Sequence, residues 1–351
     1  MDYKIIMTGY NIKFNGIDRL YSDYSWRLNR RAKAVWRSGQ VLQGQCLEQL
    51  EKEVATKYKR KYAVGVASAT DGLFFAMKSL GIGETHTVMC PVLSYKATAG
   101  AIKRTGAKIQ YIDTNNFGNI GDLSYKEVPD AVLYVNLFGN TADYGRLKSY
   151  CEEHEIPLIE DAAQSQGASY NKIPSGKLGD ISVFSFDPMK NMPSLGGGGM
   201  VLTDNETHYK QIIALRKSEM YNSLLAEDHA NQLLLILDKF DKLQTKRKKI
   251  YERYKENMPN ATFLIDESHK PSYHKLVMLT DRRDDLQGFL LLNNIETKVH
   301  YSNILDSDKV GDYQYPIAEG MCDRVISLPI YPHLTLAEVD YVCETIGKFN
   351  V

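Results

Sequence analysis

Short apolar runs alternate with longer amphipathic segments through the first two thirds of the chain. The apolar runs predict strands at residues 62–68, 87–92, 108–113, 131–138, 156–161, 180–186 and 199–204. The segments between them predict helices at residues 47–58, 71–80, 95–106 and 144–154. Because these strands are apolar throughout rather than alternating, both faces of their sheet must be covered. The pattern therefore predicts an α/β domain with a mostly parallel central sheet.

The pattern changes near residue 205, where long helices are predicted at 205–218 and 233–258. Short strands, at 274–280 and 296–301, then mix with further helices. This change predicts a smaller α+β domain after the first one. We place a large domain with an N-terminal arm at residues 1–230 and the small domain at 231–351.

Composition narrows the function classes. The 43 basic and 43 acidic residues balance, so charge gives no support for a nucleic-acid or membrane-surface partner. The five cysteines are widely spread with no CxxC pair, and the histidines show no metal-ligand spacing, so we expect neither disulfides nor a metal site. The first 16 residues lack a long apolar stretch, and no run is long enough to span a bilayer, so we expect a cytoplasmic protein.

Candidate chemistry lies where the predicted strands end, since ligands of parallel sheets bind outside the carboxyl ends of strands. Residues 68–72, SATDG, lead from a strand into a helix and could bind an anion or only cap that helix. Asp161 could pair with a cationic atom or cap the next helix, Tyr95 could pack in the core, and Lys190 alone could be a surface residue. Together, however, a lysine, a carboxylate, an aromatic and a phosphate-type helix start are what pyridoxal phosphate requires.

Two motifs, EDAAQ at 160–164 and FSFDPMKN at 184–191, carry a family resemblance. With the opening segment 39–83 and the segments IETKVHYSNIL and AEGMCDRVISLPIYPHLTLAEVDYV, they extend it over nearly the whole chain. The sequence resembles the DegT/DnrJ/EryC1/StrS sugar-nucleotide aminotransferases. This resemblance implies the pyridoxal-phosphate-dependent transferase fold of the aspartate aminotransferase type (fold type I), with a smaller α+β C-terminal domain.

The resemblance also implies roles for individual residues. Lys190 would bind the cofactor covalently and carry the proton between cofactor and substrate, and Asp161 would keep the pyridine nitrogen protonated. The other implied cofactor contacts are Gln164 beside the ring, Tyr95 stacked on it, and Ala69, Thr70 and Ser185 around the phosphate. Asn222 would reach the neighbouring site across a dimer interface. His300 and Tyr301, in KVHY, would contact the sugar nucleotide, although a structural role for His300 is an equal alternative.

Some positions depart from the family pattern without removing a cofactor anchor. They are Ala69 in place of glycine, Asp187 and Asn136 in place of histidine, Leu224 in place of arginine, and Gly197 in place of an acidic residue. Together they could mark an uncommon sugar substrate. The glycines at 196–199 could form a tight turn beneath the cofactor or only a flexible loop.

The resulting hypothesis is a homodimeric aminotransferase that moves an amino group from an amino acid, L-glutamate, to a keto sugar nucleotide. The expected substrate is a dTDP-3-keto- or 4-keto-6-deoxyhexose, for amino sugars of a surface polysaccharide such as O-antigen or of a glycosylated metabolite. A sugar dehydratase of this family would carry histidine in place of Lys190, and a non-catalytic member would have lost its cofactor anchors. The basic run at 246–249 is interpreted as a solvated helix face rather than a nucleic-acid site.

Overall fold

The structure is a computed structural model that describes residues 11–124, 127–141, 143–306 and 315–349. A seven-stranded sheet lies at its centre, in the order β1-β9-β8-β5-β4-β2-β3. In chain order these strands are β1 (Tyr62–Val66), β2 (Thr87–Pro91), β3 (Lys108–Ile112), β4 (Ala131–Val135), β5 (Leu158–Asp161), β8 (Ile181–Ser185) and β9 (Gly199–Thr203). Only β9 is antiparallel to its neighbours, β1 and β8, which confirms the mostly parallel sheet.

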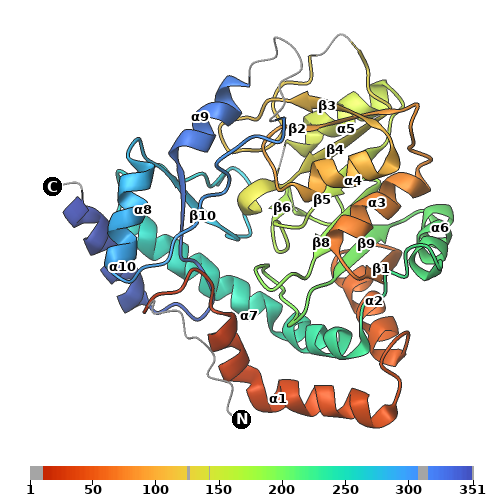
Figure 1. Cartoon of the computed structure of the whole chain (residues 1–351), viewed down its shortest axis with the longest axis horizontal. Helices are drawn as coiled ribbons and strands as arrows, with labels where there is room; N and C mark the ends of the chain where they lie inside the picture. The colour runs from red at the N-terminus through yellow and green to blue at the C-terminus, as the bar shows by residue number, and fades with distance from the viewer. Residues whose placement is uncertain (1–10, 125–126, 142, 307–314, 350–351) are drawn as a thin grey trace.

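Helices cover both faces of this sheet, as the continuous apolar strands require (Figure 1). One face packs against α3 (Ala69–Ser79), α4 (Ala97–Thr105) and α6 (Glu206–Lys217). The other packs against α2 (Gln45–Lys57), α5 (Tyr144–Glu153) and the first half of α7 (Glu227–Asn257). All of these helices agree with the sequence pattern. The N-terminal helix α1 (Ile17–Ser38) and the 3-10 turn η1 (Leu137–Gly139) were not predicted.

The C-terminal part packs around its own apolar core, to which the second half of α7 contributes. It consists of the antiparallel pair β10 (Leu276–Leu279) and β11 (Val325–Leu328) with α8 (Arg283–Leu292), α9 (Pro316–Arg324) and α10 (Leu336–Phe349). The proposed boundary at 230/231 falls within the first turns of α7, which runs continuously past it (Figure 1), and the division stays a prediction. Within the described ranges, the helices are too short or too polar to cross a membrane.

Two sequence interpretations were wrong in this region. Residues 296–301 do not form a strand: only Lys298 pairs, in an isolated bridge with Ser327, because His300 and Tyr301 turn toward a pocket instead of continuing a sheet. The basic run at 246–249 is not wholly solvated, because Arg247 is buried in α7 and donates to the Ile330 carbonyl at 2.8 Å. The other part of the earlier interpretation holds for Lys248 and Lys249, which are exposed.

Two adjacent carboxylates end β5, and strand alternation sends them to opposite faces of the sheet. Glu160 is fully buried. Its carboxylate accepts hydrogen bonds from Asn136 Nδ2 (2.8 Å), Ser175 Oγ (2.7 Å), Ser182 Oγ (2.6 Å) and the backbone N–H groups of Gly176 and Leu178 (3.0 Å each). These donors come from β8, from the end of β4 and from the turn after the short hairpin β6 (Ser169–Tyr170) and β7 (Ile173–Pro174). Glu160 is therefore a structural acceptor that ties these segments together.

We expect Glu160→Gln to lower the free energy of unfolding by about 1–3 kcal/mol, because the amide NH2 would face backbone donors that then lose their acceptor. Urea unfolding of the purified protein measures this change. Glu153→Gln, at an exposed position of α5, is the matched control and should stay within about 0.5 kcal/mol of the wild type. Equal midpoints for the two variants would contradict the role assigned to Glu160.

Candidate active site

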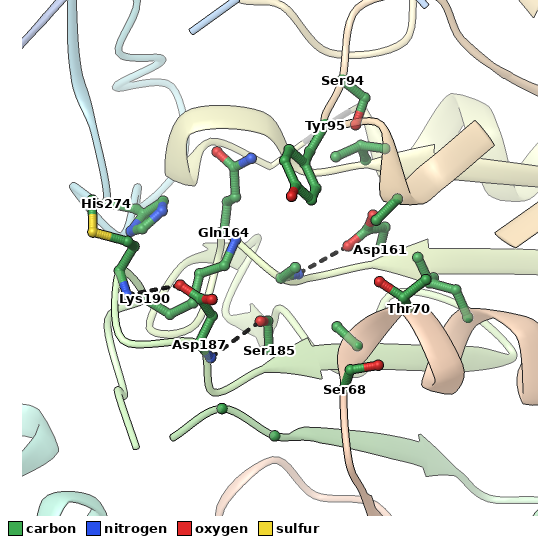
Figure 2. Close-up of a pocket in the computed structure, with 18 of the residues that line it drawn as sticks. Ser68, Thr70, Ser94, Tyr95, Asp161, Gln164, Ser185, Asp187, Lys190 and His274 are labelled. Atoms are coloured by element: carbon green, nitrogen blue, oxygen red, sulfur yellow. Dashed lines mark hydrogen bonds between the residues drawn. The ribbon is translucent and has the colours of Figure 1, made fainter. Parts of the chain in front are cut away.

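A pocket of about 640 Å³ lies where the carboxyl ends of β1, β5 and β8 meet the amino end of β9. The structure brings most of the residues expected at the site into its lining (Figure 2). These are Ala69, Thr70, Tyr95, Asp161, Gln164, Ser185, Lys190, His300 and Tyr301. Most of these residues belong to the large sheet and its loops, whereas His300 and Tyr301 come from the C-terminal part, so both parts of the chain form the pocket.

Asn222 is the exception among the expected residues. It is exposed, lies between α6 and α7, and does not line this pocket. Its backbone has a positive φ of 42°, a conformation that asparagine adopts more readily than most residues. Its assignment to the site of a neighbouring subunit stays a prediction.

Asp161 faces the pocket from the end of β5, on the opposite side of the strand from Glu160. Its two carboxylate oxygens accept from the Ala163 N–H and from Thr98 Oγ1, each at 3.1 Å. Burial raises the pKa of Asp161, while these hydrogen bonds and the charge of Lys190 act against the rise. A cation placed against this carboxylate, such as a protonated ring nitrogen, would offset the cost of burying its charge.

Lys190 lies in the loop between β8 and β9 (Figure 2). Its backbone N–H donates a hydrogen bond to the Asp187 carbonyl at 2.9 Å, which fixes the backbone of this loop. Burial lowers the pKa of Lys190, and the charges of Asp161 and Asp187 partly oppose this shift. In the part of the chain that the structure describes, its Nζ has neither a hydrogen bond nor an ion pair with another residue. A buried amine with a lowered pKa is the form that attacks an aldehyde.

The N-terminus of α3 forms another wall of the pocket. Ser68 caps this helix by accepting the Asp71 N–H at 3.1 Å, while the N–H groups of Ala69 and Thr70 belong to the first turn, which has no intrahelical acceptors. Gly199 lets β9 approach this end closely, since a Cβ there would lie 2.7 Å from the Ala69 nitrogen. The geometry supplies backbone donors and a positive helix end for a phosphate.

Gln164 and Tyr301 are held together in the lining of the pocket. Gln164 Oε1 accepts the Phe138 N–H at 3.0 Å, and its Nε2 donates to the Tyr301 hydroxyl at 3.2 Å. The rings of Tyr95 and Tyr301 lie 6.3 Å apart, and Tyr95 is 49% exposed, so its face is open to a bound ring. Tyr95 therefore does not pack in the core, the commoner role of such an aromatic.

His300 has a structural partner as well as a place in the pocket lining. Its Nδ1 lies 2.9 Å from Ser327 Oγ, and its ring stacks on Phe14 with centroids 5.6 Å apart. Burial, with the charges of Lys275 and Lys190, lowers the pKa of His300 to about 2. His300 is thus a neutral imidazole, and both of the roles expected from the sequence remain compatible with its position.

Sequence reasoning missed Thr98, Ser94 and His274, which also line or support the pocket. Ser94 Oγ lies 2.9 Å from Thr98 Oγ1, so the hydroxyl that holds Asp161 is itself fixed. Thr98 lies in the first turn of α4, one helical turn after Ser94, and this i, i+4 spacing after a strand end was the available signal. The same segment that presents Tyr95 therefore also positions the carboxylate.

The hydrogen bond between His274 and Asn191 shows which ring nitrogen of His274 carries the proton. The Nδ2 of Asn191 donates to two backbone carbonyls, of Gln166 (3.2 Å) and Ser272 (3.1 Å), so its Oδ1 must accept from His274 Nδ1 at 3.0 Å. Burial holds the pKa of His274 well below its usual range, so the imidazole is neutral. Its Nε2 is therefore a bare acceptor with no partner among the residues described.

Comparisons with known proteins fit this geometry. The model of the DegT/DnrJ/EryC1/StrS aminotransferase family matches residues 25–347. The chain is 30% identical to the "Pleiotropic regulatory protein" of Geobacillus stearothermophilus, over 97% of this chain and 98% of that protein. It is 28% identical to the GDP-perosamine synthase of Escherichia coli O157:H7, over 92% of this chain and 94% of the enzyme.

The fold is similar to that of S. venezuelae DesV, whose crystal structure holds a ketimine intermediate. That likeness has a TM-score of 0.92 at 27% identity and covers 97% of this chain and 99% of DesV. It confirms the fold type expected from the sequence. With a family model that matches most of its length, the chain belongs to the DegT/DnrJ/EryC1/StrS aminotransferase family.

Proposed function

We propose that the protein transfers the amino group of an amino acid, L-glutamate, to the carbonyl carbon of a nucleotide-linked keto sugar, with pyridoxal phosphate as cofactor. Aminotransferases of this family depend on that cofactor. The observation that carries the proposal is one pocket lined by a buried lysine, a buried carboxylate and the N-terminus of a helix. A non-catalytic member would be expected to have lost at least one of these groups.

The residues fit the cofactor at each of its polar groups. Asp161 suits the pyridine nitrogen, and Lys190 suits the aldehyde. The first turn of α3, at Ala69 and Thr70, suits the phosphate together with Ser185, which ends β8 and also lines the pocket. When bound, pyridoxal phosphate supplies an electron sink for the bond that breaks at the substrate carbon.

The chain's own part in the chemistry is to hold and move protons. Asp161 would keep a proton at the ring nitrogen of the cofactor, because a nearby buried carboxylate stabilises the charged form. The Nζ of Lys190, whose pKa burial lowers, accepts the proton from the donor's α-carbon as a general base. Gln164 and Tyr301, which are hydrogen-bonded to each other, would form a fixed wall for the substrate.

The sugar is proposed as a dTDP-linked 3-keto- or 4-keto-6-deoxyhexose. Relatives named for such chemistry support the class: one is a dTDP-3-amino-3,6-dideoxy-alpha-D-galactopyranose transaminase, 28% identical over 97% of this chain. The GDP-perosamine synthase described above carries a different nucleotide, so the class is better supported than the carbon or the base. The product would serve as an amino sugar for a surface polysaccharide or a glycosylated metabolite made in the cytoplasm.

The active unit is proposed as a homodimer in which Asn222 of one subunit completes the site of the other. Exposed apolar side chains support an interface along α1 and the segment after it. They are Trp26 and Trp36, which are 70% and 62% exposed, with Val41 and Leu42. Exposed aromatic side chains are enriched at protein–protein interfaces.

Lys190→Ala should lower turnover by at least about 10²–10⁴, the range that a positioned proton-transfer group contributes. Borohydride reduction followed by peptide mass analysis should attach the cofactor to Lys190 in the wild type and to no residue in the variant. Lys172→Ala, an exposed lysine before β7, is the control and should keep both the label and the rate. Wild-type turnover of a panel of 3-keto and 4-keto nucleotide sugars by the Lys190 variant would disprove the assignment.

Asp161→Asn separates stability from activity. Because burial raises the folded-state pKa of Asp161 above its ordinary value of 3.8, the ionised carboxylate destabilises the cofactor-free fold. The stability of the wild type, relative to the Asn variant, should therefore fall as pH rises from 3.8 through the raised pKa. Urea unfolding of both cofactor-free proteins between pH 4 and 7 measures this, and a pH-independent difference would contradict it. Turnover of the loaded variant should drop at every pH.

A further inference from the structure

A second lysine lies in the pocket, and the chemistry above does not use it. Lys275 directly precedes β10, is only 5% exposed and lines the pocket with His300 and Tyr301. Across the described ranges, its Nζ makes no hydrogen bond or ion pair with any side chain or carbonyl. Among the described residues, this amine lies over the ring of Phe14, whose centroid is 5.3 Å away.

Such a group is costly to bury. An ammonium removed from water needs a compensating charge or hydrogen bonds, and one aromatic face returns only part of the loss. The charges that act on Lys275 come from Lys190 and Arg247, which repel it, and from Asp187, which attracts it. The adjacent imidazoles of His274 and His300 are neutral. Asp187 is thus the carboxylate that acts on Lys275 at this end of the pocket, and among the described residues it forms no ion pair with the Lys275 amine.

The cofactor's phosphate does not meet that need. In Figure 2, His274, the sequence neighbour of Lys275, lies on the opposite side of the pocket from Ser68 and Thr70 at the start of α3. Asp161 lies on the same side as Thr70 and already accepts two hydrogen bonds. Lys275 is thus a cation left for an anionic group that enters with the substrate.

We propose that Lys275 binds a carboxylate of the substrate, and is a specificity-determining residue of the reaction. The inference rests on the proposed function. Two sources share this chemistry: the carboxylate of the amino-acid donor, and the carboxylate of an acidic sugar. The donor is favoured, because the Nζ of Lys275 is near enough to Lys190 for their charges to interact, and the donor's α-carboxylate is attached to the carbon that Lys190 deprotonates.

The properties of Lys275 suit a pocket that must accept two different substrates in turn. An amino-acid donor brings a carboxylate, whereas a neutral keto sugar does not. Burial, with the charges of Lys190 and Arg247, lowers the pKa of Lys275 to about 7. The amine can therefore hold a proton when a carboxylate is beside it and release the proton when a neutral sugar replaces the acid. A permanently charged arginine would bind the acid but oppose the sugar.

Equilibrium binding to the cofactor-loaded enzyme tests this. The variants are Lys275→Met, which is similar in length and uncharged, and Lys275→Arg, which keeps the charge; Lys270→Met, an exposed lysine in the same segment, is the control. L-glutamate is titrated against the visible absorbance of the cofactor, and 2-oxoglutarate is titrated calorimetrically against the aminated form. Lys275→Met should weaken the binding of L-glutamate and of 2-oxoglutarate by roughly 10- to 100-fold. Lys275→Arg should recover much of this affinity, and Lys270→Met should bind both ligands as the wild type does.

The pH dependence separates anion binding from a structural role. Above about pH 7 the wild type should take up a proton when 2-oxoglutarate binds, seen as a calorimetric enthalpy that changes with buffer, and its affinity should fall as pH rises. Lys275→Met should show neither effect. Its urea midpoint should equal or exceed that of the wild type, because an uncompensated buried cation is gone.

UDP-glucuronate and UDP-glucose separate the two carboxylate sources. If Lys275→Met loses affinity only for L-glutamate and 2-oxoglutarate, the carboxylate is that of the donor. If it loses affinity only for UDP-glucuronate, the carboxylate is that of an acidic sugar. Either result supports the inference. Unchanged binding in Lys275→Met, or an equal loss for UDP-glucose with a lowered urea midpoint, overturns it. A wild type whose absorbance responds to no amino acid would instead refute the proposed function, and the donor-carboxylate inference with it.

Discussion

The pocket depends on the side-chain alternation of one short strand. At the end of β5, Glu160 points into a cage of five donors that ties the neighbouring segments together, while Asp161 points the other way into the pocket. A shift of one residue in the pairing of β5 would exchange these faces and place the structural carboxylate in the site. The register between β5 and β8, with Asp161 opposite Val183, therefore fixes both the core and the chemistry.

Charge is distributed along the pocket in an ordered way. The start of α3 and the carboxylate of Asp161 lie on one side of the pocket, and Lys190 lies with His274 toward the other (Figure 2), while Lys275 also belongs to the lining. Among the described residues, the amines of Lys190 and Lys275 have no hydrogen bond or ion pair within the protein. Burial of these amines without a partner costs free energy, which a bound anion or a covalent bond to a cofactor would offset.

Sequence patterns predicted the sheet, most helices and the residues at strand ends, because strand ends are local signals. Asp161, Ser185 and Lys190 each follow an apolar run, and their positions needed no knowledge of long-range contacts. Lys275 and His274 precede their strand and reach the pocket only because the C-terminal part folds against the large sheet. Helix α1 was missed because its buried positions, Leu20, Leu28, Ala32 and Val35, are sparse among charged and aromatic residues.

The position of β9 between β1 and β8 also determines when the site can form. Among the strands that the structure describes, β1 pairs with β9 alone, which comes more than a hundred residues later in the chain. During synthesis from the N-terminus, β1 and the helix start that follows it must wait for Thr203 to emerge before they join the sheet. Pairings of such long sequence separation form slowly and leave strand edges open in the meantime. The glycine-rich entry to β9 is thus the point at which a nascent chain completes the pocket wall at the start of α3.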